Sequence, residues 1–252
     1  MTRLLAAALT VTALLLIPAT GPAQADDALT RGDVETIVRE YLIDNPDVIR
    51  EALEELERRE VEAANRARTE QLDQISEVLL NSTRQVELGN PDGDVTMVEF
   101  FDYNCGYCKR AMADMLKLME QDPELRVVLK EFPVLGQGSV EAAQVAVAVS
   151  HVAPDAYLDF HKALMNTRGQ ANLASALAAA KDVGLDVAKV EAAIGEPEVN
   201  ATIEEVYMLA RRLGLNGTPA YVIGDEVLMG AVGFDRLKTQ IDTTRDCGET
   251  TC

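Results

Sequence analysis

Apolar residues recur every three or four positions through the charged first part of the sequence, before residue 83. This spacing predicts an amphipathic helix, because residues three and four apart lie on one helix face. Thr30 with Asp33 three residues later is similar to a capping box at the helix start, and Asn45-Pro46 ends this helix and begins a second one. The apolar positions of the first helix are Val34, Ile37, Val38, Tyr41 and Leu42.

The second predicted helix carries a longer but interrupted apolar stripe. This stripe is too narrow to form a core by itself, so it needs a partner, either another copy of the chain or the rest of the same chain. Its length and charged flanks favour self-association, and a solvated spacer helix is the alternative. We therefore expect residues 26–82 to be a helical oligomerisation segment. Its apolar positions are Ile49, Leu53 and Leu56, then, after an alanine-rich gap, Leu72, Ile75 and Leu79.

After residue 83 the pattern changes to short apolar runs bounded by turn residues. Val95–Phe101 and Leu125–Phe132 are typical of buried strands, and Gln85–Leu88 predicts a shorter one. Tyr221–Ile223 and Val227–Met229 flank Gly224-Asp225-Glu226, which predicts a hairpin. A last helix is expected from Phe234 to about Thr243.

The segment between these halves, at about residues 138–214, is rich in alanine and predicts a run of helices. Without it, the order is strand, strand, helix, strand, strand, strand, helix. That is a βαβ unit joined to a ββα unit, the order of the thioredoxin fold. The prediction is therefore an α/β thioredoxin fold over residues 83–243, with an inserted helical domain and a preceding helical segment. The five expected helices of the insertion are Glu141–Val152, Tyr157–Met165, Leu173–Val183, Val187–Ile194 and Val199–Leu213.

The most specific motif is Cys105-Gly106-Tyr107-Cys108, at the junction of a predicted strand and helix. Two thiols this close can form a disulfide, and the first lies where the N-terminus of a helix favours a thiolate, the nucleophile of disulfide exchange. A structural zinc site would need a second pair of ligands. The remaining cysteines lie at the far C-terminus, and His151 and His161 show no ligand spacing. The motif therefore predicts a redox dithiol, with no metal and no cofactor.

The first 25 residues predict a cleaved secretory signal peptide. Arg3 supplies the positive charge, Leu4–Ile17 the apolar segment and Ala23-Gln24-Ala25 the cleavage site. An uncleaved membrane anchor is the alternative. Export to a periplasm would place the dithiol in an oxidising compartment. The formal net charge of −19, which loss of Arg3 takes to about −20, disfavours nucleic acid as a partner.

Residues 244–252 form a tail that contains Cys247 and Cys252. In an oxidising compartment two close thiols usually pair, which predicts a structural disulfide. The alternatives are a second redox pair that exchanges with the first, or a metal or intermolecular role. The acidic neighbours Asp246 and Glu249 argue against a reactive thiolate.

Three blocks together resemble the DsbA-like branch of the thioredoxin superfamily, over about residues 84–243. They are Val98–Tyr103 leading into the dithiol, Lys130–Gly136 and Gly217–Gly224. Val38–Leu42 with Asn45-Pro46 is similar to the leader of the suppressor-of-copper-sensitivity C (ScsC) type. That type includes oligomeric disulfide isomerases that assemble through N-terminal helices.

The resemblance implies a role for each motif residue. Cys105 is the exposed nucleophile and Cys108 the more buried resolving thiol, with Gly106 and Tyr107 between them at the substrate. Thr218-Pro219 resembles the cis-proline loop that faces the active site and pairs with a substrate strand. An ordinary proline at a strand start is the alternative.

Glu99 is an acid within an apolar strand, where burial is costly unless the group is paired or protonated. The resemblance places it near Cys108, as the acid that helps to move the proton of that thiol. A solvent-facing position on an alternating strand is the alternative. Lys130, on the adjacent predicted strand, is a candidate charge partner.

The leading interpretation is a thiol–disulfide oxidoreductase, most simply an isomerase or reductase of protein disulfides. Strongly oxidising members carry a histidine between the cysteines, and Gly106-Tyr107 lacks it. The implied partners are proteins with cysteines or disulfides, further copies of the chain, and a membrane redox partner that keeps the dithiol reduced. The alternatives are a DsbA-type oxidase that donates disulfides, and a copper-tolerance protein that binds Cu(I) through thiolates.

Overall fold

A computed structural model describes residues 29–248 of the chain, which divides into two units, residues 1–60 and 61–252. The first contains α1 (Arg31–Asp44) and the beginning of α2 (Pro46–Asn81). The expected capping box is present, since the Asp33 carboxylate accepts from the Thr30 backbone N–H at 2.9 Å. The predicted signal peptide lies outside the described residues. No helix in the described range is long and apolar enough to cross a membrane.

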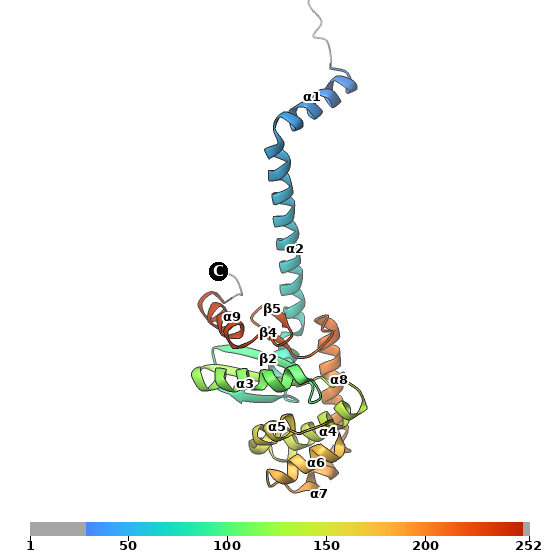
Figure 1. Cartoon of the computed structure of the whole chain (residues 1–252), viewed down its shortest axis with the longest axis vertical. Coiled ribbons are helices and arrows are strands. Elements are labelled where there is room, and N and C mark those ends of the chain that lie inside the picture. Colours follow the sequence, from blue (N-terminus) through green and yellow to red (C-terminus); the bar gives the residue numbers. More distant parts are fainter. Residues whose placement is uncertain (1–28, 249–252) are drawn as a thin grey trace, which may run out of the picture. The chain divides into compact units, whose positions relative to one another are not determined.

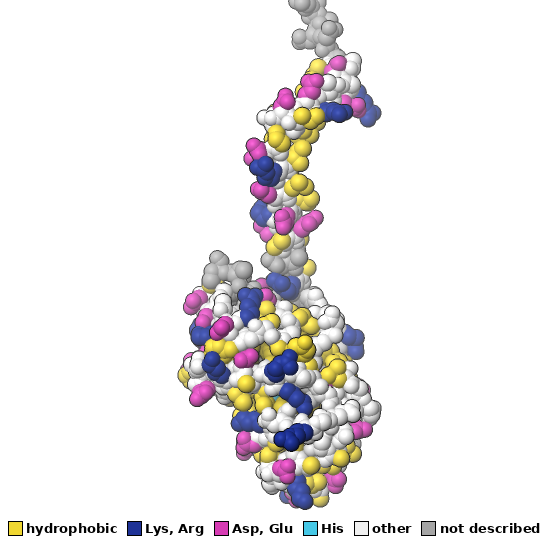
Figure 2. Space-filling view, in the orientation of Figure 1, with side chains coloured by type: hydrophobic (Ala, Val, Ile, Leu, Met, Phe, Trp, Pro, Cys, Tyr) yellow, Lys and Arg dark blue, Asp and Glu magenta, His cyan; other side chains and the backbone are white. Residues whose placement is uncertain are grey.

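The apolar residues of α1 and of the beginning of α2 lie on the surface. No residue of α1 is buried, and Figure 2 shows hydrophobic side chains along both helices. Large apolar side chains at helical spacing are seldom left in water unless they bind something. The exposed members are Val34, Ile37, Val38, Tyr41, Ile43, Val48, Ile49, Leu53 and Leu56.

The second unit contains a five-stranded sheet in the order β1-β3-β2-β4-β5 (Figure 1). Strand β2 pairs in parallel with β3 and antiparallel with β4, and both edge strands are antiparallel to their neighbours. This is the predicted thioredoxin order. The strands are β1 (Val86–Gly89), β2 (Val95–Phe101), β3 (Leu125–Glu131), β4 (Ala220–Ile223) and β5 (Glu226–Met229).

One face of the sheet packs against α3 (Gly106–Gln121) and α9 (Phe234–Cys247), and the other against α8 (Pro197–Arg212) and the end of α2. Leu72, Ile75 and Leu79 of α2 join a core with Phe100 and Phe132. The apolar stripe of α2 is therefore divided. Its last turns bind the chain's own domain, which corrects the expectation that the whole stripe serves self-association.

The predicted helical insertion lies between β3 and β4 and forms a bundle around α4, which contacts each of the other inserted helices. The alanines of α4 are buried, and their small side chains let neighbouring helices approach closely. The inserted helices are α4 (Gln137–Val152), the 3-10 turn Pro154–Ala156, α5 (Tyr157–Met165), α6 (Leu173–Asp182), α7 (Val187–Ile194) and α8.

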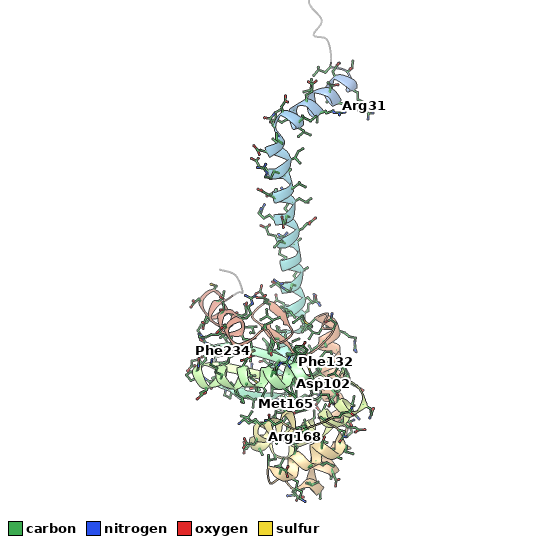
Figure 3. The ribbon with its side chains drawn as sticks, viewed as in Figure 1. Arg31, Asp102, Phe132, Met165, Arg168 and Phe234 are labelled. Atoms are coloured by element: carbon green, nitrogen blue, oxygen red, sulfur yellow. The ribbon has the colours of Figure 1, made fainter. Side chains whose placement is uncertain are left out.

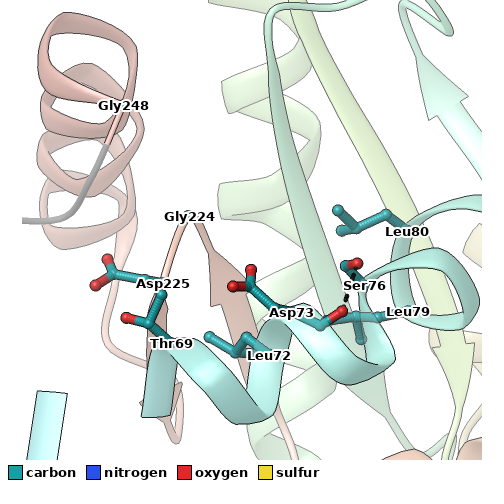
Figure 4. Close-up of a pocket in the computed structure, with 9 residues that line it drawn as sticks. All are labelled: Thr69, Leu72, Asp73, Ser76, Leu79, Leu80, Gly224, Asp225 and Gly248. Atoms are coloured by element: carbon teal, nitrogen blue, oxygen red, sulfur yellow. Dashed lines mark hydrogen bonds between the residues drawn. The ribbon is translucent and has the colours of Figure 1, made fainter. Parts of the chain in front are cut away.

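A pocket of about 350 Å³ lies between the last third of α2 and the β4–β5 turn (Figure 4). Leu72, Asp73, Ser76 and Asp225 are among its lining residues. Because β4 runs antiparallel to β2, this turn lies at the sheet edge where β2 begins, away from Cys105. The pocket is therefore separate from the dithiol.

Candidate active site

Cys105 is the N-cap residue of α3, with an extended backbone and no side-chain cap hydrogen bond. Its thiol is therefore at the positive end of the helix dipole, where a thiolate is favoured. Cys105 is 6% exposed and Cys108 is fully buried. Cys108 is the more buried of the two, as predicted, but Cys105 is itself buried and is not the exposed thiol that was expected. Both are free thiols. This geometry suits attack by Cys105 and resolution by Cys108.

The Thr218–Pro219 peptide bond is cis, as expected from the resemblance. The Cys105 thiol donates to the Thr218 carbonyl oxygen at 3.1 Å, so this loop faces the nucleophile. Gly106 and Tyr107 are exposed beside it, and Tyr107 is 60% exposed. The predicted substrate-binding residues are thus brought together around one sulfur atom.

The Cys108 thiol is held in its protonated form. Burial raises its pKa well above the usual range, and the nearby Cys105 and Glu99 raise it further, against a hydrogen bond from the Asp102 backbone. A thiol of this kind attacks a mixed disulfide only after a base removes its proton. The neighbourhood of Cys108 must therefore supply a proton acceptor.

Glu99 is the candidate proton acceptor for Cys108. It is 3% exposed, which excludes the solvent-facing alternative, and its partner in the sheet is Tyr221. Burial raises the pKa of Glu99 to about 8, with the charge of Asp114 adding to the shift and a hydrogen bond from Tyr221 opposing it. A carboxyl with this pKa exchanges its proton near neutral pH, as a general acid–base group requires. Its part in proton transfer to and from Cys108 stays a prediction.

Glu99 should make the stability of the fold depend on pH. Its pKa is 4.5 before burial and about 8 after it, so between these values the folded chain holds a proton that the unfolded chain has lost. The free energy of unfolding should therefore fall as pH rises, by up to about 1.4 kcal/mol per pH unit. Urea unfolding should show that the stability of Glu99→Gln relative to the native chain rises by about 4 kcal/mol between pH 5 and 8.

The control for this test is Glu120→Gln, an exposed position on the same helix as Cys108. It should follow the native pH profile. Parallel profiles for the native chain and Glu99→Gln would show that Glu99 does not titrate in this interval.

Lys130 is not the charge partner of Glu99, which corrects the expectation from sequence. The parallel register pairs Glu99 with Leu129 and Phe100 with Lys130, so the two side chains lie on opposite faces of the sheet. The Lys130 ammonium donates instead to the Val78 carbonyl oxygen in the last turn of α2, at 3.2 Å. Burial lowers the pKa of Lys130 to about 7. Its role is to satisfy a helix C-terminus.

Asp102 is a structural centre of the site that the sequence did not reveal. It is 2% exposed, and its two carboxylate oxygens accept four hydrogen bonds. One oxygen accepts from the Asn104 N–H at 2.7 Å and from the Ser139 hydroxyl at 2.8 Å. The other accepts from the Val134 and Leu135 N–H groups at 2.8 and 3.0 Å. The turn before Cys105 is thus tied to the loop after β3 and to the start of α4.

Asn104, directly before Cys105, connects the same turn to the insertion. Its side-chain oxygen accepts from the Ala171 N–H at 2.6 Å, and its amide donates to the Ala171 carbonyl at 2.9 Å. Both bonds reproduce the pairing of two strands. No pattern in the sequence predicts these two hydrogen bonds, because the two residues are 67 positions apart.

A second buried polar cluster connects Tyr103 with the insertion. Glu131 accepts from the Tyr157 hydroxyl at 2.8 Å and from the Tyr103 hydroxyl at 3.2 Å, and His161 lies 3.1 Å from the Tyr103 hydroxyl. Burial raises the pKa of Glu131 and lowers that of His161 to about 3. The cluster is therefore neutral and structural. Among the described residues, no group of three or more His, Cys, Asp and Glu side chains is placed to hold a metal ion.

Cys247 lies across the domain from the dithiol. Two residues before it, Arg245 binds Asp94 at 2.7 Å and Asp122 at 2.8 Å, at the start of β2 and the end of α3. Cys105 is at the other end of α3, and a helix of 16 residues is about 24 Å long. This separation argues against exchange between the two cysteine pairs within one chain. Cys247 is disulfide-bonded, and its predicted partner Cys252 lies outside the described residues.

Comparison with known proteins gives two family matches. A model described as a DSBA-like thioredoxin domain matches residues 96–242, and one described as the copper resistance protein ScsC N-terminal domain matches residues 31–63. The first includes the dithiol, the insertion and the cis-proline loop. The second includes the exposed apolar residues of α1.

Solved structures and a curated relative agree with these matches. A thioredoxin-like oxidoreductase from Silicibacter pomeroyi DSS-3 is 43% identical, with a TM-score of 0.65 over 68% of this chain and 98% of the other. The catalytic domain of Proteus mirabilis ScsC is 32% identical, with a TM-score of 0.66 over 70% and 98%. Disulfide bond formation protein D of Bacillus subtilis (strain 168) is 24% identical over 63% of this chain and 76% of its own length.

Proposed function

The chain belongs to the DsbA-like thioredoxin family of thiol–disulfide oxidoreductases, and from this membership we propose that it is a periplasmic isomerase and reductase of protein disulfides. Cys105 attacks a substrate disulfide and forms a mixed disulfide with one of its sulfurs. A second substrate thiol then displaces Cys105, which is isomerisation, or Cys108 displaces the substrate, which is reduction. Glu99 accepts the Cys108 proton in the reductive branch.

The observation that carries this proposal is the exposed apolar surface of α1 and the start of α2. An enzyme that only donated disulfides would have no need of it. In this proposal copies of the chain bury these surfaces against one another, and several dithiols then act on one misfolded substrate. The match to the ScsC N-terminal domain over residues 31–63 supports such assembly.

The pair Gly106-Tyr107 supports the isomerase over the oxidase. A histidine between the cysteines stabilises the reduced thiolate and makes the disulfide strongly oxidising; the chain lacks it. An isomerase needs its dithiol reduced, so a membrane redox partner is part of the proposal. The predicted signal peptide and the relative described as a periplasmic thioredoxin-like protein from Salmonella enterica support a periplasmic location.

Substitution of glutamate for Leu53 tests the assembly. Leu53 is 60% exposed in the single chain, so the variant should fold. In an assembly each copy would bury a charge, at a cost of several kcal/mol. Light scattering should show several chains per particle for the native protein and one for Leu53→Glu. Repair of scrambled disulfides should fall about tenfold or more, while reduction of insulin disulfides should persist.

Glu54→Gln is the matched control, because it changes the adjacent exposed residue without adding a charge. It should retain the native particle mass and the native repair rate. A native chain that is already a monomer, or a Leu53→Glu variant with unchanged mass and repair, would contradict the assembly.

A further inference from the structure

Three basic side chains lie near the dithiol of this strongly acidic chain. Lys109 and Arg110 follow Cys108 directly on the first turns of α3. The Lys109 ammonium donates to the Thr167 carbonyl oxygen at 3.0 Å, which places it beside the exposed Arg168. The Arg110 guanidinium lies 4.4 Å from the centre of the Tyr107 ring, directly at the active-site motif.

Figure 2 shows Lys and Arg side chains gathered over the middle of the second unit, near the start of α3, where Figure 3, in the same view, labels Asp102 and Arg168. The formal net charge of the whole chain is −19, so a local basic cluster stands against the general charge. We call Lys109, Arg110 and Arg168 the basic rim.

The basic rim has no acidic partner of its own. Other basic side chains of the second unit do form ion pairs, for example Arg84 with Glu205 and Arg126 with Glu87. Within the described part of the chain, none of the three rim residues is in an ion pair. Lys109 donates to the Thr167 carbonyl and Arg110 lies over the Tyr107 ring. Three cations without counter-charges beside a reactive sulfur form a surface that attracts anionic groups.

Two exposed apolar residues lie in the loop that is tied to the active-site turn. Val134 and Leu135 are 40% and 51% exposed, and the Asp102 carboxylate fixes both backbone N–H groups next to the active-site turn. The active-site turn therefore has exposed apolar side chains in a neighbouring loop as well as the cations of the basic rim.

We propose that the basic rim selects protein segments in which acidic residues flank the reacting cysteine. This inference rests on the proposed function and names its substrate class. Surface charge pairs contribute little individually, so each rim residue should change the rate of exchange about two- to fivefold. The effect should be on encounter and binding, and the chemistry at Cys105 should be the same for every substrate.

The test uses the reduced full chain and short peptides whose single cysteine is disulfide-bonded to thionitrobenzoate. Attack by the Cys105 thiolate on the peptide sulfur forms the enzyme–peptide disulfide and releases thionitrobenzoate. Cys108 then displaces the peptide as a thiol, leaving the Cys105–Cys108 disulfide, so one disulfide is reduced for each one formed. The peptides carry aspartate, asparagine or lysine on both sides of the cysteine and are otherwise identical.

At about 0.1 M salt, charges more than about 10 Å away are screened, so the acidity of the whole chain should matter little. The aspartate peptide should release thionitrobenzoate about three- to tenfold faster than the asparagine peptide, and the lysine peptide should be slowest. In about 1 M salt the three rates should converge.

Arg168→Gln should lower the ratio of aspartate to asparagine rates about two- to fivefold, and Arg168→Glu should lower it further. The matched control is Lys181→Gln, an exposed cation on α6 outside the basic rim, which should leave the ratio unchanged. Equal rates for the aspartate and asparagine peptides, or a ratio unaffected in Arg168→Glu, would overturn the inference. No release from any peptide would instead overturn the proposed function.

Discussion

Replacement of Cys108 with alanine is expected to turn the protein into a trap for its substrates. Cys105 remains at the N-cap of α3 and can still attack a disulfide, but the thiol that completes reduction is gone. Mixed disulfides should accumulate, and reduction of insulin should fall to the uncatalysed background. Non-reducing electrophoresis followed by mass spectrometry should locate the bond at Cys105.

Cys105→Ala is the control for this trap. Cys108 is fully buried and burial holds it protonated, so this variant should form no mixed disulfide and should also lose insulin reduction. Comparable trapping by the two variants would show that the order of attack is not set by burial and helix position.

Asp102→Asn is expected to lower the free energy of unfolding strongly, although it replaces only one oxygen atom by an amino group. All four groups around the carboxylate donate hydrogen bonds, and an amide has only one accepting oxygen. In either orientation of the amide, at least one part-buried N–H of the active-site turn or of the loop after β3 loses its acceptor. Each such loss costs about 1–3 kcal/mol, so the free energy of unfolding should fall by about 2–5 kcal/mol in urea titrations.

The same substitution at Asp92 provides the control. Asp92 lies exposed in the turn before β2, and Asp92→Asn should change stability by less than about 0.5 kcal/mol. A nearly native stability for Asp102→Asn would mean that the site does not depend on this carboxylate.

The fold could be predicted because local pattern and overall topology agree. Val95–Phe101 is a mostly apolar run, interrupted by Thr96 and Glu99 and bounded by Asp94 and Asp102, and the strand occupies those same residues. The helical insertion could be separated because its alanine-rich segments differ from the strands on both sides of it. The predicted and observed helix ends differ by a few residues. Helix α9, for example, continues past Thr243 to Cys247, because Gly248 ends it in a left-handed conformation.

The active site could be predicted only where a short motif carries it. Cys105, Cys108 and the cis bond at Pro219 follow from motifs of a few residues. Asp102 and Asn104 lie directly before the Cys105–Cys108 motif in the sequence, yet their roles depend on Ser139 and Ala171, which the fold alone brings close. The prediction that Lys130 pairs with Glu99 was wrong for a related reason. Adjacent strands bring two residues close along the sheet, but the register decides which face each side chain occupies.

The apolar stripe of α2 shows that a sequence pattern also does not predict what packs against a helix. Spacing identifies which residues share a helix face, but it does not identify what covers that face. Leu72 and Leu79 are covered by the chain's own sheet, whereas Leu53 remains exposed. Identical patterns along one helix can therefore be covered by the chain's own domain in one part and exposed in another.

Reactivation of scrambled ribonuclease by the reduced full chain tests the central claim most directly. The account predicts that the native chain restores ribonuclease activity in catalytic amounts, and that Cys105→Ala restores none above the uncatalysed background. Failure of the native chain to reactivate scrambled ribonuclease, while it still reduces insulin or oxidises reduced ribonuclease, would contradict an isomerase.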